Sequence, residues 1–303
     1  MPKYFLFMNV TGSYAFDEKF RLAEKGGLKM LSEKYGHEKA TDSQAKQVLQ
    51  AFKRSEYYSA FRKANIGATK QKIRDYVNKD LLIVQSINAI DDIDRSANSI
   101  AKRLREWYEL YCPEISRAID GHEKFAEIIA KKPRKQLLAE LHIEEDESMG
   151  GHLDKGDIDA LLDLAKKVKE LFMYKGRIQD YLESSMKGYC PNLGEIAGFQ
   201  LGARLLAHAG TLKRLAAMPS STVQLLGAEK ALFRHIKTGA RSPKHGIIVN
   251  HPVIAKSKPK DHGRFARIIA DKISMAARID YFHGKKASTA LKQEIVAKTG
   301  VEF

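Results

Sequence analysis

A long helical repeat limits the folds open to this chain more than any other feature. Across residues 81–111, apolar side chains recur at spacings of three and four over about four heptads. A strand cannot keep that period, so the segment predicts one long helix of the coiled-coil type. A second run with the same spacing follows further along the chain, at Ile158, Leu161, Ala165, Val168 and Phe172.

The polar residues 144–157 separate these two runs, which predicts an antiparallel hairpin with its tip at Gly150 and Gly151. Each of the two cysteines lies in a Tyr-Cys-Pro triplet, and Cys112 and Cys190 are equally far along the chain from residue 151. A hairpin folded there would bring both prolines to the same height and make the cysteines neighbours. Buried thiols are expected in preference to a disulfide.

The first 80 residues have a different pattern. Residues 4–10 form an apolar, aromatic run, and Thr11, Gly12 and Ser13 give a turn signal before mixed helical segments. This predicts a small α/β module, in which about half of the aromatic set is core because a module of this size needs its own interior. The remaining aromatics are expected to form a docking surface.

Positive charge is concentrated in the last third of the chain. Residues 211–303 contain 18 Lys and Arg against 6 Asp and Glu, whereas residues 1–210 contain 34 against 31. A basic region attached to a near-neutral remainder is typical of a domain that binds a polyanion, with nucleic acid as the first candidate and an acidic protein as another. No run of about 18 apolar residues occurs, so no membrane partner is expected. The apolar run in the first ten residues, MPKYFLFMNV, is too short for a signal peptide and is soon followed by polar residues. A cytoplasmic location is therefore predicted.

The cations gather most densely around residues 227–251. Glycines at 227 and 239 flank a predicted helix of about three turns. Its cations, Lys230, Arg234 and Lys237, share one face, and Ala231, Leu232 and Ile236 lie on the opposite one. Arg241, Lys244 and His245 follow in the next loop. Such a stripe beside a helix N-terminus suits a sugar-phosphate backbone, although a solvated amphipathic helix has the same pattern.

Catalytic signatures are absent from the sequence. There is no GxxxxGK[ST] loop and no strand-linked GxGxxG, and the glycine pair at 198 and 202 predicts close helix packing instead. The aspartates at 91, 92 and 94 diverge around a helix and are expected to be solvated. His245 and His251 are interpreted as polar contacts or packed imidazoles, because no metal-ligand spacing accompanies them.

Two long segments of the sequence resemble a known protein family. The run PSSTVQLLGAEKALFRHIKTG at 219–239 and PKHG at 243–246 resemble the Nop domain of box C/D ribonucleoprotein core scaffold proteins, the archaeal branch most closely. The segment INAIDDIDRSANSIAKRLREWYELYCPEI at 87–115 is similar to the central helical region of that family. The chain ends at residue 303 without a long Lys-rich tail resembling that of eukaryotic members, and its N-terminal module is compact; both features favour the archaeal branch.

The resemblance implies a mainly α fold with three parts. Residues 1–80 would be an α/β domain that holds the methyltransferase fibrillarin. Residues 81–205 would be a coiled-coil hairpin that forms a homodimer, and residues 206–303 a helical Nop domain that clamps a box C/D guide RNA already bound by a kink-turn-binding, ribosomal-protein-like partner. The chemistry, 2′-O-methylation, would belong to fibrillarin and its S-adenosylmethionine. The chain itself would have no catalytic residue, cofactor or metal.

The resemblance also assigns an interface. The family's GAEK and ALFR segments correspond to residues 227–230 and 231–234, expected on the joint surface of RNA and kink-turn protein. Ala231 and Leu232 are expected to pack underneath. Glu229 would be repelled by phosphate unless it caps the helix or pairs with a cation of the protein partner. The predicted interface is therefore Gly227, Ala228, Glu229, Lys230, Phe233, Arg234, Lys237, Arg241, Lys244 and His245.

Two alternatives from other classes remain. A coiled-coil DNA-binding or chromatin protein would have the same basic charge and would bind plain duplex DNA at low salt. An RNA-modifying enzyme would need a cofactor pocket, for which the sequence has no fingerprint.

Overall fold

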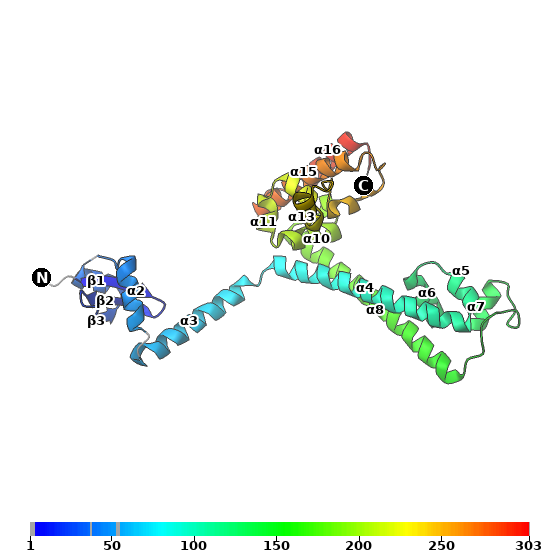
Figure 1. Ribbon diagram of the computed structural model, residues 1–303, viewed down its shortest axis with the longest axis horizontal. Helices are drawn as coiled ribbons and strands as arrows, with labels where there is room; N and C mark the ends of the chain where they lie inside the picture. The colour runs from blue at the N-terminus through cyan, green and yellow to red at the C-terminus, as the bar shows by residue number, and fades with distance from the viewer. Residues whose placement is uncertain (1–3, 37, 53–54, 303) are drawn as a thin grey trace. The chain divides into compact units, whose positions relative to one another are not determined.

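The computed structural model describes residues 4–36, 38–52 and 55–302 (Figure 1). The chain divides into two compact units, Met1–Asn78 and Lys79–Phe303. Helices dominate, and among the described residues strands form a single three-stranded sheet in the first unit. The expected mainly α fold with an α/β start is confirmed.

The first unit is built on an antiparallel meander. Strands β1 (Tyr4–Asn9), β2 (Gly12–Asp17) and β3 (Leu22–Gly26) pair in that order, with Phe5 opposite Phe16. The chain reverses between β1 and β2 at the predicted turn, where Gly12 has a φ of 133° that a residue with a Cβ rarely adopts. Helices α1 (Leu28–Tyr35), α2 (Asp42–Ala51) and α3 (Ser55–Tyr76) follow.

Aromatic side chains make the core of this unit. Phe5, Phe7, Tyr14 and Phe16 are all buried, together with Phe52, whose ring meets that of Tyr14 edge-on at 5.1 Å. The expectation that about half of the aromatic run is a docking surface was wrong, because only Tyr4 of that set remains half-buried. A sheet this small has few other apolar side chains with which to fill its interior.

The second unit begins with the predicted hairpin. Helices α4 (Lys79–Tyr111) and α8 (Lys155–Tyr189) run antiparallel along each other, and the Lys175 ammonium lies 2.8 Å from the Asp94 carboxylate across the pair (Figure 1). Apolar positions of both repeats, among them Leu104 and Val168, are fully buried between them. The periodicity therefore predicted both arms correctly.

The turn of the hairpin differs from the prediction. The midpoint of the paired residues 94 and 175 lies between 134 and 135, and three short helices fill the connection: α5 (Pro113–Ala118), α6 (His122–Lys131) and α7 (Arg134–Glu140). Gly151, the predicted tip, donates its N–H to the Leu110 carbonyl at 2.8 Å. Residues 144–157 therefore return the chain to the end of α4, and α8 starts beside it.

This register separates the two cysteines. Cys112 follows α4 and belongs to the apolar cluster around Leu104, whereas Cys190 follows α8 at the opposite end of the hairpin and belongs to the cluster around Leu193. Both are buried and free. The expectation that they are neighbours was wrong, because the arms pair about residue 134 and not about residue 151.

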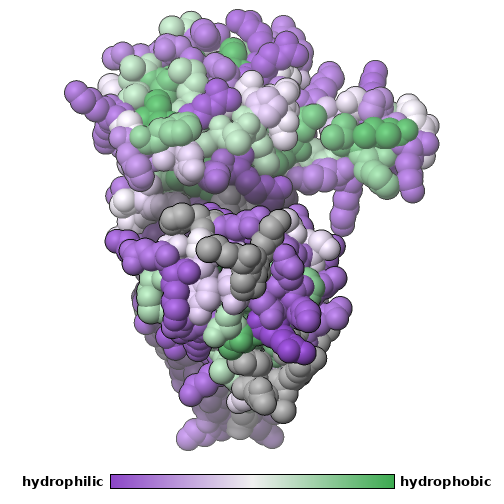
Figure 2. Space-filling model, turned by 90° about the vertical axis from the view of Figure 1, so that its left-hand side faces the viewer, coloured by the Kyte–Doolittle hydropathy of each residue, from purple (hydrophilic) through white to green (hydrophobic). Residues whose placement is uncertain are grey.

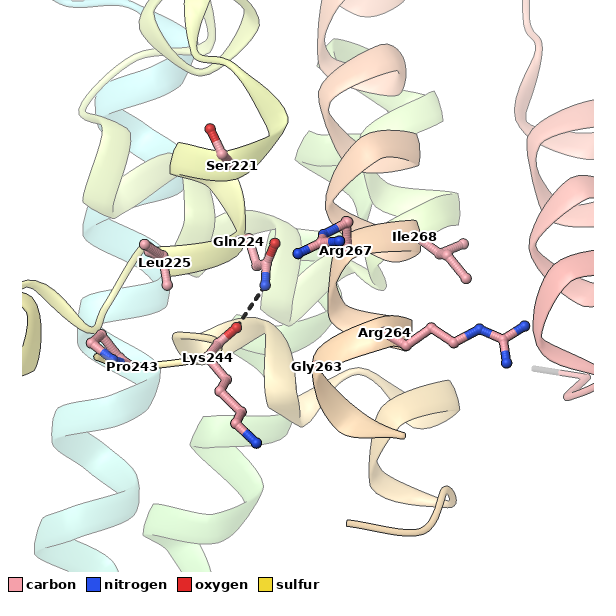
Figure 3. Close-up of a pocket in the computed structure, with 9 residues that line it drawn as sticks. All are labelled: Ser221, Gln224, Leu225, Pro243, Lys244, Gly263, Arg264, Arg267 and Ile268. Atoms are coloured by element: carbon pink, nitrogen blue, oxygen red, sulfur yellow. Dashed lines mark hydrogen bonds between the residues drawn. The ribbon is translucent and has the colours of Figure 1, made fainter. Parts of the chain in front are cut away.

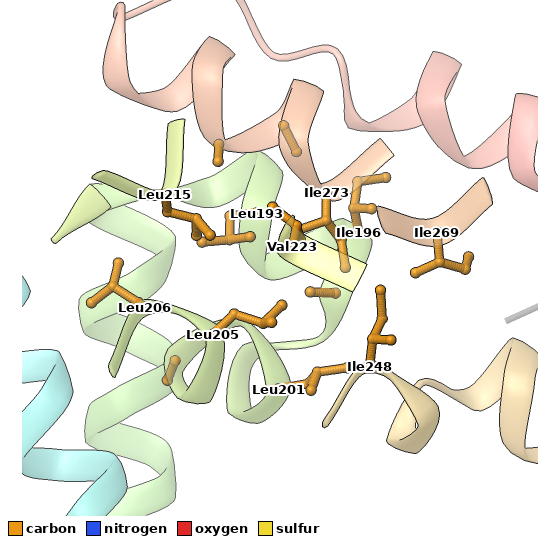
Figure 4. Close-up of a cluster of buried hydrophobic side chains, with 14 of the residues drawn as sticks. Leu193, Ile196, Leu201, Leu205, Leu206, Leu215, Val223, Ile248, Ile269 and Ile273 are labelled. Carbon is orange, nitrogen blue, oxygen red and sulfur yellow. The ribbon is translucent and has the colours of Figure 1, made fainter. Parts of the chain in front are cut away.

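The rest of the second unit is a helical bundle. Its elements are α9 (Pro191–Ala197), α10 (Phe199–Ala209), α11 (Leu212–Ala217), α12 (Ser220–Leu225), α13 (Glu229–Thr238), the 3-10 turn η1 (Ile247–Asn250), α14 (Pro252–Ala255), α15 (His262–Tyr281) and α16 (Ser288–Thr299). Leu205, Leu215 and Ile273 meet in its core (Figure 4). The methyl end of Met186 would lie only 3.1 Å from a Cβ at Gly202, which supports the predicted close packing at that glycine.

Buried and half-buried carboxylates join distant elements of this unit. The Asp280 carboxylate on α15 accepts the backbone N–H groups of Asn192 and Leu193 at 3.1 and 2.8 Å, and so caps α9. On α4, Asp91 binds Arg204 of α10 at 2.6 Å. The aspartates at 91 and 94 are therefore paired with cations, which corrects the expectation of a merely solvated face, while Asp92 is exposed and pairs with Arg95.

Candidate nucleic-acid interface

Helix α13 lies on the surface of the bundle, and none of its residues, 229–238, is buried. Gly227 precedes it with a φ of 82°, and Gly239 ends it in the left-handed conformation with a φ of 68°. Both values favour glycine, because a Cβ is strained there. The predicted flanking glycines therefore delimit the helix as the sequence indicated.

The cations of α13 are available to a ligand. Lys230, Arg234 and Lys237 are exposed, and within the described part of the chain no carboxylate forms an ion pair with any of them. Arg241 and Lys244 are exposed in the loop that follows. A row of unpaired cations along one exposed helix and its following loop is an arrangement that binds a phosphate backbone.

Apolar side chains are exposed among these cations. Phe233 is 59% exposed and Ile236 is 72% exposed, with the Lys237 ammonium 4.8 Å from the centre of the Phe233 ring. Ala231 and Leu232 are half-buried beneath the helix, as expected. Ile236, which was placed on the same face as Ala231 and Leu232, is not covered as they are and stays exposed.

Glu229 is held by its own chain. Its carboxylate accepts the Gly227 N–H at 2.8 Å and lies 3.5 Å from a ring nitrogen of His208. Burial raises the pKa of Glu229, but backbone N–H groups of Gly227 and Glu229 and the nearby His208 outweigh this and leave the pKa below its ordinary value. The expected helix cap is not formed: the Glu229 carboxylate binds the backbone N–H of Gly227, which precedes the helix, and α13 has no side-chain cap hydrogen bond. Ala228, the residue before α13, is half-buried beside it.

The loop after α13 is tied to α12. The Gln224 amide donates to the Lys244 carbonyl at 2.6 Å, and the Gly246 N–H donates to the Gln224 carbonyl at 2.8 Å. His245 is half-buried, with its ring centre 6.1 Å from that of His262. These contacts fix the main chain of residues 244–246 and so fix the position from which Lys244 extends.

The structure reveals a second cationic segment that was not among the residues predicted from the sequence. Lys256, Lys258 and Lys260 are exposed before α15, and Arg264 and Arg267 are exposed on its first turns. Arg264, Arg267 and Lys244 line one groove together with Ser221 and Gln224 of α12 (Figure 3). The density of lysines at 256–260 is the sequence signal that could have found this segment.

The remaining candidates give no catalytic or metal centre. His251 is buried, with one ring nitrogen 2.8 Å from the Ile196 carbonyl and the other accepting the Val253 N–H, and burial lowers its pKa, so it is a packed imidazole as expected. Within residues 4–36, 38–52 and 55–302, His, Cys, Asp and Glu side chains form no group that could hold a metal ion. No described helix is both long and apolar enough to span a bilayer. The face shown in Figure 2 is largely hydrophilic, with separate hydrophobic areas.

Comparison with known proteins gives consistent matches. The family model described as Nop, snoRNA binding domain, fibrillarin, matches residues 89–300. A NOP5 family protein of Methanocaldococcus jannaschii is 39% identical over 243 residues, which are 74% of this chain and 59% of that protein. Nucleolar protein 56 of Schizosaccharomyces pombe is 36% identical over 246 residues, 73% of this chain and 50% of that protein.

A chain in a solved fibrillarin/Nop5p complex is similar at 21% identity and a TM-score of 0.46, over 97% of this chain and 99% of that one. The present chain spans only about half the length of the curated relatives that it matches.

Proposed function

Because the chain belongs to the Nop family, we propose that it is the non-catalytic scaffold of a box C/D guide ribonucleoprotein. In this proposal the C-terminal bundle binds guide RNA together with a kink-turn-binding protein. The α4 and α8 hairpin joins two copies of the chain, and the first unit holds fibrillarin. Fibrillarin then methylates ribose 2′-hydroxyls with its own S-adenosylmethionine, and the scaffold sets where it acts.

The composition of the α13 surface carries this proposal. Its unpaired cations suit RNA phosphates, whereas the exposed Phe233 and Ile236 would gain nothing from a sugar-phosphate backbone and suit an apolar protein surface. A ligand that contains RNA and protein side by side satisfies both. Glu229 is compatible with it, because its carboxylate already accepts the Gly227 N–H.

The first unit offers a surface for fibrillarin that differs from the expected aromatic one. A hollow of about 270 Å³ lies between β1 and the start of α1, and its rim includes Met8, which is 68% exposed, and Leu28. Exposed apolar side chains around a hollow are typical of protein interaction sites. Positioning a methyltransferase in this way lowers a barrier without donating a catalytic side chain.

The hairpin likewise leaves apolar side chains uncovered. Met173 is 60% exposed on α8, and Tyr174 and Tyr181 follow it on the same helix. Long paired helices with exposed apolar edges are typical of self-association, which supports the proposed homodimer.

Reconstitution with each component omitted in turn tests the proposal. The full chain, guide RNA, kink-turn protein and fibrillarin together should methylate a guided target, and no methylation or S-adenosylmethionine binding is expected from the chain alone. The chain should bind the RNA and kink-turn protein complex far better than naked RNA. Methyl transfer by the chain without fibrillarin, or equal binding to plain duplex DNA, would contradict the scaffold assignment and favour an enzyme or a DNA-binding protein.

A further inference from the structure

A groove lies between α12 and the start of α15. It has a volume of about 720 Å³, and Ser221 and Gln224 of α12 face Gly263 and Arg267 of α15 across it. The Arg267 guanidinium points across the groove toward Gln224, whereas that of Arg264 points away (Figure 3). Arg264 instead approaches the Lys298 carbonyl at 3.3 Å. Arg267 is therefore the guanidinium inside the groove.

The lining is positive without compensation. Lys244, Arg264 and Arg267 belong to it, and no acidic residue does. In the described part of the chain, no carboxylate pairs with any of these three cations. Because the Arg264 guanidinium points away, Lys244 and Arg267 are the unpaired cations that concentrate the field at this concave surface, and the groove favours an anionic ligand.

The other walls indicate what kind of anion fits. Leu225, Pro243 and Ile268 give the groove apolar surface next to its cations. A nucleic-acid duplex presents phosphates outward and keeps its base faces stacked inside, so it could not use these walls. A single strand presents phosphates and unstacked base faces at the same time, which matches a surface of both kinds.

The loop that follows α13 forms one wall of the groove. Pro243 and Lys244 line this wall and belong to the loop in which further cations follow those of α13. The Gln224 side-chain amide holds the loop in place by donating to the Lys244 carbonyl. We propose that this groove binds a single-stranded RNA segment that leaves the surface of α13. The proposal rests on the proposed function for the presence of RNA on α13, and adds a second RNA site with its own strand requirement.

A matched pair of RNAs tests the groove with the full chain and the kink-turn protein. One RNA ends at the kink turn, and the other carries a single-stranded extension of about ten nucleotides, within the range that one single-strand site covers. The native chain should bind the extended RNA roughly three- to tenfold more tightly. Arg267→Gln should abolish this gain in affinity. For the extended RNA, the slope of log affinity against log salt concentration should become shallower by about 0.7, while the affinity for the unextended RNA stays unchanged.

Arg103→Gln is the control, because Arg103 is exposed on α4 and loses the same charge. It should retain the full gain, and unchanged thermal melting should show that both variants fold. The proposal is overturned if the extension adds nothing to binding by the native chain, if a duplex extension gives the same gain, or if Arg267→Gln retains it. Failure to bind even the unextended complex would overturn the proposed function as well, so the two failures are distinguishable.

Discussion

Gly246 lies so close to Leu226 that a Cβ at position 246 would come within 1.8 Å of the Leu226 carbonyl oxygen. The Ile247 N–H donates to the same carbonyl at 2.8 Å, so the two backbones are held together as well as in contact. This approach joins the segment before α13 to the loop after it, and it sets the position of Lys244. The cationic surface therefore depends on a backbone contact that bears no charge.

Gly246→Ala should destabilise the C-terminal bundle. The added methyl group must displace backbone, so we expect a loss of about 1–3 kcal/mol in the free energy of unfolding, visible in urea denaturation. Gly263→Ala is the control, because its Cβ would meet only the Lys244 side chain, at 3.8 Å in ordinary contact. It should be neutral or slightly stabilising. Equal stability of the two variants would show that the contact at residue 246 is not tight.

Charge reversal on α13 should weaken binding of the RNA and kink-turn protein complex. Lys230→Glu combined with Arg234→Glu removes two unpaired cations. We expect the binding affinity to fall on the order of tenfold or more, and the plot of log affinity against log salt concentration to have a slope shallower by about two. Lys166→Glu with Lys167→Glu changes the charge equally on exposed positions of α8 and serves as the control. Fluorescence anisotropy at several salt concentrations measures both. An equal loss in the control pair would mean that only net charge matters.

The hydrogen bond from the Gly227 N–H to the Glu229 carboxylate should be sensitive to acid. Because its folded pKa lies below the ordinary value of 4.5, its contribution to stability is present above that value and is lost as the pH falls through the folded pKa. NMR titration should therefore show Glu229 ionising below 4.5, with the Gly227 amide shifting in parallel. Glu229→Gln should remove the pH dependence at that amide. A Glu229 titration at or above 4.5 would contradict the hydrogen bond from Gly227.

The two thiols should be unreactive in the native protein. Burial raises the pKa of the Cys190 thiol to about 12 and also raises that of Cys112, so little thiolate exists at about pH 8. A thiol reagent should label neither residue before denaturation and both afterwards. Failure to label either residue even in denaturant would indicate a disulfide, which the separation of the cysteines at opposite ends of the hairpin does not allow.

The chain should be a dimer through its second unit. Removal of residues 1–78, which form a compact unit of their own, should leave the association intact. Met173→Glu should shift the mass toward the monomer, because Met173 is exposed on the proposed edge of α8. Light scattering at micromolar concentration measures each mass. A native chain that is a monodisperse monomer would contradict the predicted dimer.

The sequence by itself determined the local structure. Periodicity predicted both arms of the hairpin, since a repeat of three and four residues can bury its apolar side chains only as a helix. Gly227 and Gly239 predicted the limits of α13, because both positions have a positive φ that glycine accepts readily. The cations on that helix followed from the same 3.6-residue period.

Only the tertiary structure decided how distant residues meet. Symmetry about residue 151 could not locate Cys112 and Cys190, because the inserted helices α5 to α7 shift the pairing of the arms and because helix register depends on side-chain packing. The fate of Ile236 also depended on whether another element covers α13, which periodicity does not reveal. The groove brings together residues 221, 244 and 267, which no local pattern connects, since the fold and not chain distance places them together.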